Sequence, residues 1–239
     1  HYNRNIKIMS GIVGSRFNIR GSGLVGSLGT DGQVFTSSGA GVSHTFEDAA
    51  GGGAWTLIKV ISIGTSATIS FVHGTSDVVF DGTYQAYKIF MRNWRNDSGS
   101  YGSLNMRFYQ TGSDGTGTAT EHTSSNYYYG CRFQHGSPGS SVNYGGHGAT
   151  SFKLEGGVGT INTTTTSNSN GEITIASTDE HRNMYYYIGS NMNQHGYGSA
   201  MYSGGFFQQA YHIGGVKLWP NSGSFAGNGE AYLYGLAKS

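Results

Sequence analysis

Short runs in which apolar and polar residues alternate recur along most of this chain. Residues 67–71 place Ala67, Ile69 and Phe71 on one side, and residues 104–109 place Leu104, Met106 and Phe108 on one side, at every second position. A period of two is typical of a strand with one buried face. The alternation therefore predicts β-strands in both segments.

Further segments show the same pattern or are dense in β-branched and aromatic residues. They are separated by stretches rich in Gly, Ser, Asn and Thr, such as residues 162–171, which we expect to be loops. The additional strands are predicted at residues 6–9, 56–63, 84–94, 151–154, 172–175, 184–188, 215–219 and 230–234. Many short strands without a helical period indicate an all-β fold, a β-sandwich or jelly roll, and their spacing is too irregular for a solenoid or propeller.

A weaker pair of alternating runs lies upstream of these strands. Residues 33–36 and 42–46 are joined by a short glycine-bearing stretch, which predicts a β-hairpin. The hairpin has too few apolar residues to bury a core alone, so we expect its apolar positions to pack against partner chains or against the sandwich. These positions are Val34, Phe35, Val42 and Phe46.

The sequence Ala-Ala-Gly-Gly-Gly-Ala at residues 49–54 is typical of a hinge. We therefore place a domain boundary there. Residues 1–54 are predicted to be a Gly-rich connector with a hairpin, and residues 55–239 a β-sandwich domain. The first residue is His1 and not Met, so we expect the sequence to be a processed chain or part of a longer one.

Composition narrows the possible partners. Only 11% of the 239 residues are charged and the net charge is +1, which predicts no binding to nucleic acid or to anionic lipid. The 17 tyrosines, 12 phenylalanines and 3 tryptophans are enough for a core and argue against disorder. The one cysteine, Cys131, cannot form an intrachain disulfide and is expected to be buried. No apolar run is long enough to insert into a membrane.

The segment "WTLIKVISIGTSATISFVHGTSDVVFDGTYQAYKIF" at residues 55–90 resembles a domain that recurs in virion proteins of tailed bacteriophages. Its pattern is a Trp-x-Leu-Ile opening, a strand ending in Ser-Phe, and a Phe-Asp-x-Thr-Tyr-x-x-Tyr segment. The end of the chain is similar to the closing hairpin of that family, with Leu233, Tyr234 and Gly235 as its signature. The resemblance implies a virion component such as a tail fibre or appendage, and it specifies no catalytic residues.

Tyrosine clusters at residues 126–129 and 184–188 give strands with an aromatic on each face. Tyrosine among Ser, Gly and Asn is the composition of adaptable recognition surfaces. Aromatic rings also stack on the apolar faces of sugars. Four aromatics that we expect in loops are candidates for glycan or receptor contact, with subunit packing or ordinary exposure as the alternative: Trp94, Tyr101, Tyr197 and Tyr202.

The nine histidines show no spacing typical of a metal site, so no metal or cofactor is predicted. His122, His135 and His147 could share one face of a sheet, and a histidine on the axis of a trimer could still gather an ion. The acidic residues are scattered, and only Asp179, Glu180 and His181 cluster. A glycosidase needs two facing carboxyl groups, so we expect no enzymatic activity.

These observations favour a non-enzymatic subunit of a phage tail fibre or appendage, located in the virion. The sandwich would bind a host-surface glycan or receptor, and the N-terminal segment would join other virion proteins. A homotrimer is expected because a thin Gly-rich connector needs neighbouring chains to bury its apolar positions. The alternatives are a capsid decoration or cement protein and, further off, a polysaccharide-degrading enzyme.

Overall fold

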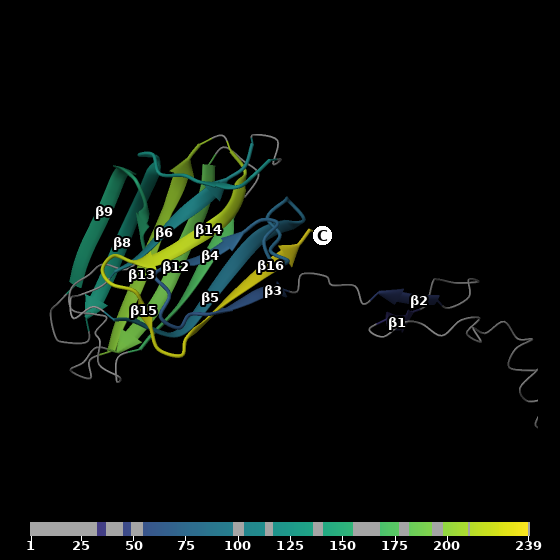
Figure 1. Ribbon diagram of the computed structural model, residues 1–239, viewed down its shortest axis with the longest axis horizontal. Helices are drawn as coiled ribbons and strands as arrows, with labels where there is room; N and C mark the ends of the chain where they lie inside the picture. The colour runs from purple at the N-terminus through teal and green to yellow at the C-terminus, as the bar shows by residue number, and fades with distance from the viewer. Residues whose placement is uncertain are drawn as a thin grey trace, which may run out of the picture. The chain divides into compact units, whose positions relative to one another are not determined.

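The computed structural model describes residues 33–36, 45–48, 55–97, 103–112, 117–135, 141–154, 168–176, 182–192, 198–209 and 211–238. Every regular element among them is a β-strand (Figure 1), so the prediction of an all-β fold is confirmed. The chain divides into two units, His1–Gly52 and Gly53–Ser239. Each unit is described separately below.

In the first unit, strands β1 (Gln33–Thr36) and β2 (Thr45–Asp48) pair antiparallel, as expected of a hairpin. The register pairs Phe35 with Phe46, but it pairs Val34 with Glu47 and not with an apolar position. The second strand begins later than the sequence pattern predicted, and Val42 lies outside the described residues. The packing of these apolar positions against partner chains stays a prediction.

The second unit contains two antiparallel sheets. The large sheet has the order β3-β16-β5-β11-β12-β13-β8-β9, with β15 also paired to β5. Its strands are β3 (Trp55–Ser62), β5 (Tyr84–Asn96), β8 (Tyr127–His135), β9 (Ser141–Ala149), β11 (Ser169–Ala176), β12 (Arg182–Met192), β13 (Gly198–Gln208), β15 (Phe225–Ala226) and β16 (Glu230–Ala237). Most of its neighbouring strands are distant in the sequence.

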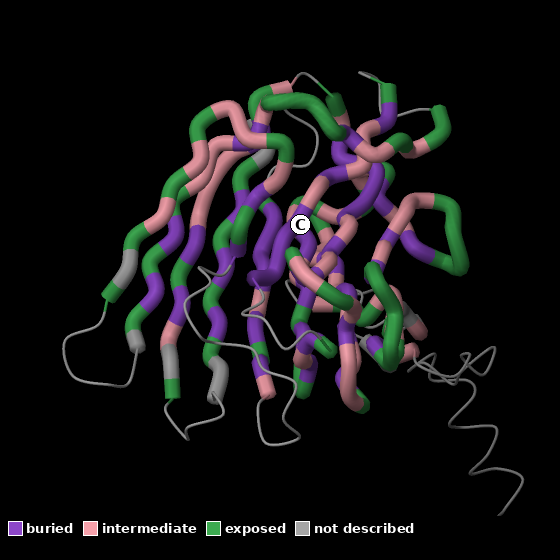
Figure 2. The backbone as a smooth tube through the Cα atoms, turned by 60° about the vertical axis from the view of Figure 1, so that its left-hand side comes forward, coloured by how far each residue is buried: buried purple, intermediate pink, exposed green. Residues whose placement is uncertain are grey.

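The small sheet has the order β10-β6-β14-β4, and β7 pairs with β6. Its strands are β4 (Ile69–Val72), β6 (Leu104–Gln110), β7 (Thr120–Glu121), β10 (Phe152–Lys153) and β14 (Ile213–Pro220). Figure 2 shows buried positions alternating with exposed ones along many of the strands. This alternation is the period of two that the sequence displays.

One core lies between the two sheets and draws side chains from both. The Phe108 ring of β6 meets the Phe207 ring of β13 with centroids 5.6 Å apart. The Tyr127 hydroxyl of β8 accepts a hydrogen bond from the Phe108 N–H at 3.2 Å and donates one to the His122 carbonyl at 2.8 Å. A buried tyrosine hydroxyl needs such partners, and here they join the sheets into a sandwich. Cys131 is buried, as expected.

Four of the longer strands differ from the sequence prediction. Residues 169–171 belong to β11, although they were expected in a loop, and β8 extends the strand expected at residues 126–129 as far as His135. Strands β9 and β13 cover stretches for which no strand was predicted. Their many glycines and hydroxyl residues hide the alternation. Pairing with neighbouring strands compensates for their weak intrinsic preference. Among the described residues there is no helix with the length and hydropathy to cross a membrane.

Candidate binding site on the outer face of the large sheet

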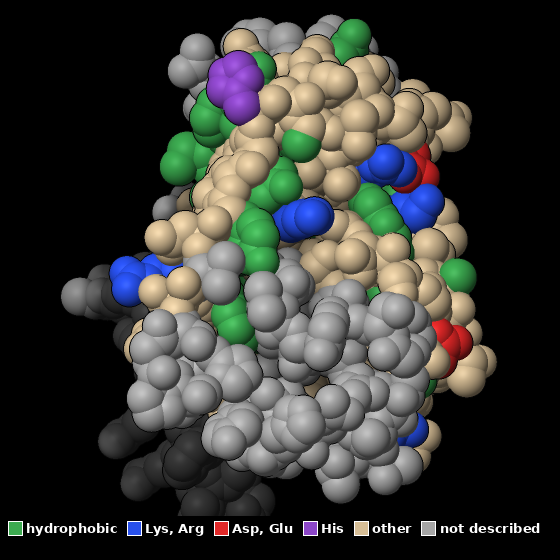
Figure 3. All heavy atoms as spheres, turned by 90° about the vertical axis from the view of Figure 1, so that its left-hand side faces the viewer, with side chains coloured by type: hydrophobic (Ala, Val, Ile, Leu, Met, Phe, Trp, Pro, Cys, Tyr) green, Lys and Arg blue, Asp and Glu red, His purple; other side chains and the backbone are tan. Residues whose placement is uncertain are grey.

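The large sheet turns one face away from the core, here called the outer face. In β12 the side chains of Met184, Tyr186 and Ile188 are exposed, while Tyr185 and Tyr187 between them are buried. Antiparallel partners point to the same side of a sheet. The register pairs these three residues with Phe206, Gly204 and Tyr202 of β13, in that order. The outer face is therefore rich in apolar and aromatic side chains. Figure 3 views the molecule from the side where β9 lies, and hydrophobic side chains are scattered over that side as well.

A groove crosses four strands of this face and has a volume of about 380 Å³. Phe90 of β5, Ile188 of β12 and Tyr202 of β13 supply large apolar side chains to it. Its other lining residues are Asn170, Gly171, Glu172, Gly189, Ser190 and Ala200. The groove thus combines an apolar surface with a few polar groups, which is typical of ligand sites.

The carboxylates at and beside this groove are each paired with a cation. Lys88 Nζ lies 2.9 Å from Glu172 Oε1, and the same ammonium lies 4.7 Å from the centre of the Trp55 ring. Arg92 pairs with Glu230 on the neighbouring strand β16. Hydrogen bonds donated by Tyr232 and by Arg92 both lower the pKa of the Glu230 carboxyl group, and the bond from Tyr232 contributes most. Both carboxylates are therefore matched by a cation, while Arg132 of β8, the register partner of Tyr202, is exposed next to the groove.

A bulge shapes one end of the groove. The register between β5 and β11 shifts between Ser169 and Gly171, and Asn93 on the facing strand has a φ of 53°. Left-handed backbone is unfavourable for residues other than glycine, although asparagine tolerates it better than most. The Asn93 N–H donates to Asn170 Oδ1 at 2.9 Å, so a groove residue stabilises the bulge.

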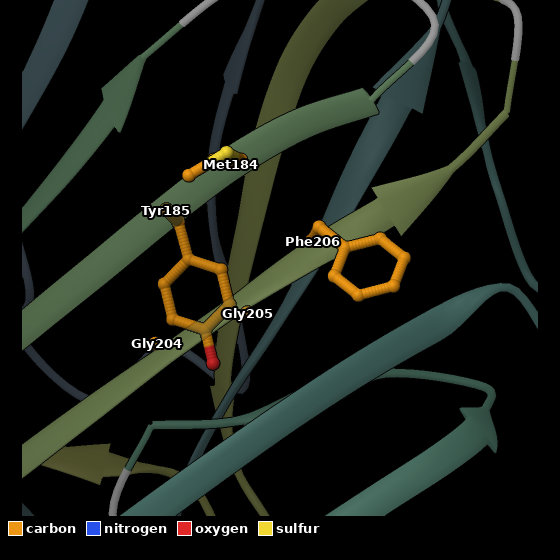
Figure 4. A pocket seen from close by; sticks show the side chains of 5 residues that line it. All are labelled: Met184, Tyr185, Gly204, Gly205 and Phe206. Atoms are coloured by element: carbon orange, nitrogen blue, oxygen red, sulfur yellow. The ribbon is translucent and has the colours of Figure 1, made fainter.

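A second pocket, of about 410 Å³, is lined by Met184, Tyr185, Gly204, Gly205 and Phe206. Figure 4 shows these residues on two adjacent strands, β12 and β13. The Phe206 ring stacks on Tyr128 of β8 with centroids 4.9 Å apart, and His147 of β9 meets Tyr128 edge-on at 4.7 Å. These contacts hold the aromatic side chains beside this pocket in place.

Of the four predicted contact residues, the structure leaves one exposed at the groove and buries another in the core. Tyr202 lies in a strand and not in a loop, but it is 52% exposed and lines the groove. The expectation for Trp94 is wrong, because it lies in β5, is fully buried, and packs edge-on against Phe225 at 5.6 Å. The register shift at Asn93 moves the alternation of β5 by one residue, and this directs the Trp94 ring into the core. Tyr101 and Tyr197 lie outside the described residues.

Among the described residues no three His, Cys, Asp or Glu side chains gather as a metal site would require. His122 is buried against Phe207, whereas His147 lies exposed on the outer face, so these two histidines do not share a face. His122 is held by Gln110 Oε1 at 2.7 Å and by Asn126 Nδ2 at 2.9 Å. Burial lowers its pKa, which favours the neutral ring.

Sequence reasoning missed Phe90, Asn170, Glu172 and Ile188 as groove residues. The alternation of residues 84–94 does assign Phe90 to the side opposite Ile89 and Met91, as the structure confirms. However, the residues that join it in the groove come from β11, β12 and β13, far along the chain. Only the order of strands in the sheet brings them together.

No protein-family model matches this chain, and no curated protein matches it.

Proposed function

We propose that this chain is a non-enzymatic recognition subunit of a bacteriophage tail fibre or appendage, and that its sandwich binds an uncharged glycan on the host surface. The groove that contains Tyr202 carries the proposal. Phe90, Ile188 and Tyr202 offer apolar faces on which a sugar ring can stack, and amide, hydroxyl and carboxylate groups lie beside them. Rigid aromatic contacts combined with small polar residues suit such recognition.

The pairing of the carboxylate that lines the groove supports an uncharged ligand. Glu172, the carboxylate that lines the groove, is paired with Lys88. An anionic ligand would meet this carboxylate, and a cationic ligand would compete with the lysine. The pairing of Glu172 with a cation also supports a binding role over hydrolysis, which needs a second carboxyl group across the groove.

Binding to immobilised neutral and anionic glycans tests the proposal. We expect the protein to bind neutral glycans, and we expect Tyr202→Ala and Phe90→Ala each to weaken binding about tenfold or more, because stacking area is lost. Tyr211→Ala is the matched control, since Tyr211 is also partly exposed but does not line the groove. Absence of glycan binding, or equal binding by all three variants, would overturn the proposed glycan site.

The location in the virion rests on the resemblance of residues 55–90 and of the C-terminal segment to phage virion proteins. Immunogold electron microscopy of virions that carry this chain should place the label on the tail or its appendages. Label over the head surface would favour a capsid decoration protein instead. Light scattering on the purified chain should give the mass of a trimer, and a stable monomer would contradict the proposed assembly.

A further inference from the structure

Asn170 presents one defined end of its carboxamide to the groove. Its Oδ1 accepts the Asn93 N–H at 2.9 Å, and a backbone N–H can only donate. The oxygen must therefore face Asn93, which leaves the Nδ2 group as the remaining hydrogen-bonding end. The left-handed backbone of Asn93 holds this arrangement at the bulge. Strained backbone that is kept in place by a specific partner is common at binding sites.

Glu172 supplies the complementary group two residues further along β11. Lys88 Nζ and the Thr174 hydroxyl both approach Oε1, at 2.9 and 3.5 Å. Among the described residues no donor is directed at Oε2. Residues two apart on a strand share a face and lie about 7 Å apart. A donor at position 170 and an acceptor at position 172 therefore point from the same face into the groove.

We infer that Asn170 and Glu172 determine the specificity of this groove, by reading two neighbouring hydroxyl groups of an uncharged sugar. Asn170 Nδ2 donates to one hydroxyl oxygen, and Glu172 Oε2 accepts from the other hydroxyl. The sugar ring lies against the apolar groove residues, of which Tyr202 is the most exposed. This inference rests on the proposed function of the groove as a glycan site.

The substitution Asn170→Asp isolates the donor. It keeps the shape of the side chain and the oxygen that accepts the Asn93 N–H, but it replaces the donor by a second acceptor. Titration calorimetry with maltohexaose, cellohexaose and N-acetylchitohexaose measures the affinity. For the hexaose that binds the wild type, we expect a loss of tenfold or more in Asn170→Asp and a smaller loss in Glu172→Gln, which keeps one acceptor oxygen.

One variant serves as a matched control. Asn143→Asp places the same new charge on β9, outside the groove residues, and should leave the affinity unchanged. Thermal unfolding of each variant shows whether the fold is intact.

The outcomes separate this inference from the proposed function. If the wild type binds a hexaose and Asn170→Asp binds it equally well, the donor role is overturned while the glycan site stands. If Asn170→Asp loses affinity and thermal stability together, Asn170 serves the fold and the inference is likewise overturned. If the wild type binds none of the hexaoses, the glycan site itself fails and this inference fails with it.

Discussion

Tyr186 and Tyr187 are adjacent in β12, yet they meet opposite surroundings. Tyr186 is 46% exposed on the outer face, whereas Tyr187 is 1% exposed in the core. The Tyr187 ring occupies space that a side chain at Gly171 or Gly189 would fill, because a Cβ added at either glycine would lie within 2.4 Å of that ring or its hydroxyl. The same residue type thus builds the core on one face of the sheet and leaves a surface for partners on the other.

The same contrast recurs at two other adjacent pairs. Gly204 and Gly205 in β13 take opposite faces: a Cβ at Gly204 would meet only ordinary contacts, but one at Gly205 would lie 2.2 Å from the Tyr128 carbonyl oxygen. At β7, Glu121 pairs with two cations on the small sheet, and the next residue, His122, packs against Phe207 in the core. Position in the alternation, more than residue type, decides the role of each side chain.

Truncation of Tyr187 and Tyr186 should give the largest difference in stability between the two faces. We expect Tyr187→Ala to lower the free energy of unfolding by about 3–5 kcal/mol, because it leaves a cavity in the core. Tyr186→Ala should change it by less than about 0.5 kcal/mol, since exposed positions contribute little. Urea unfolding followed by fluorescence measures both values, and similar losses in the two variants would contradict the assignment of the faces.

The adjacent glycines of β13 test the same contrast with one and the same substitution, glycine to alanine, on opposite faces of the sheet. Gly205→Ala should destabilise the fold by about 1–3 kcal/mol, because the new methyl group meets backbone that cannot move aside. Gly204→Ala should stay within about 0.5 kcal/mol of the wild type or add stability, since the unfolded chain loses freedom. Unfolding curves that rank the two variants in the reverse order would show that Gly204, and not Gly205, is required by the fold.

On the small sheet, Glu121→Gln should cost about 1 kcal/mol, because it weakens hydrogen bonds from Arg107 at 2.8 Å and Lys217 at 2.7 Å. Burial disfavours the charge on Glu121, but these two hydrogen bonds outweigh it and lower the pKa of the carboxyl group. The unfolded chain therefore binds the proton first as pH falls below about 4.5, and the stability from Glu121 is lost on acidification. Unfolding between pH 3 and 6 should show a smaller loss in the variant than in the wild type.

The smallest effect is expected at His122, whose pKa is lowered by burial. As pH falls below about 6.5, the unfolded chain binds a proton at this histidine more readily than the folded chain, so stability decreases. We expect a decrease of less than about 1 kcal/mol between pH 7.5 and 5.5. His122→Gln should remove this part of the pH dependence, and an unchanged slope in the variant would assign the effect to another group.

Part of the candidate site follows from local sequence. The alternation of residues 84–94 assigns Phe90 to the surface side, and that of residues 104–109 assigns Phe108 to the core, both as observed. The same pattern, continued, would place Trp94 on the side of Phe90 and Arg92. The bulge at Asn93 shifts the alternation by one residue and turns the Trp94 ring into the core, so the loop assignment was wrong. Strands β9 and β13 could not be predicted in this way, because their glycines carry no side chain that shows which face they take.

The sequence by itself determined that the chain is all-β and which side chains of its regular strands face inward, because successive side chains of a strand point to opposite sides whatever the strand pairs with. Only the tertiary structure decided which strands are neighbours. The groove exists because β5, β11, β12 and β13 lie side by side, and because a bulge turns Asn170 toward Asn93. Both depend on hydrogen bonds between segments far apart along the chain, and no local pattern of residues encodes them.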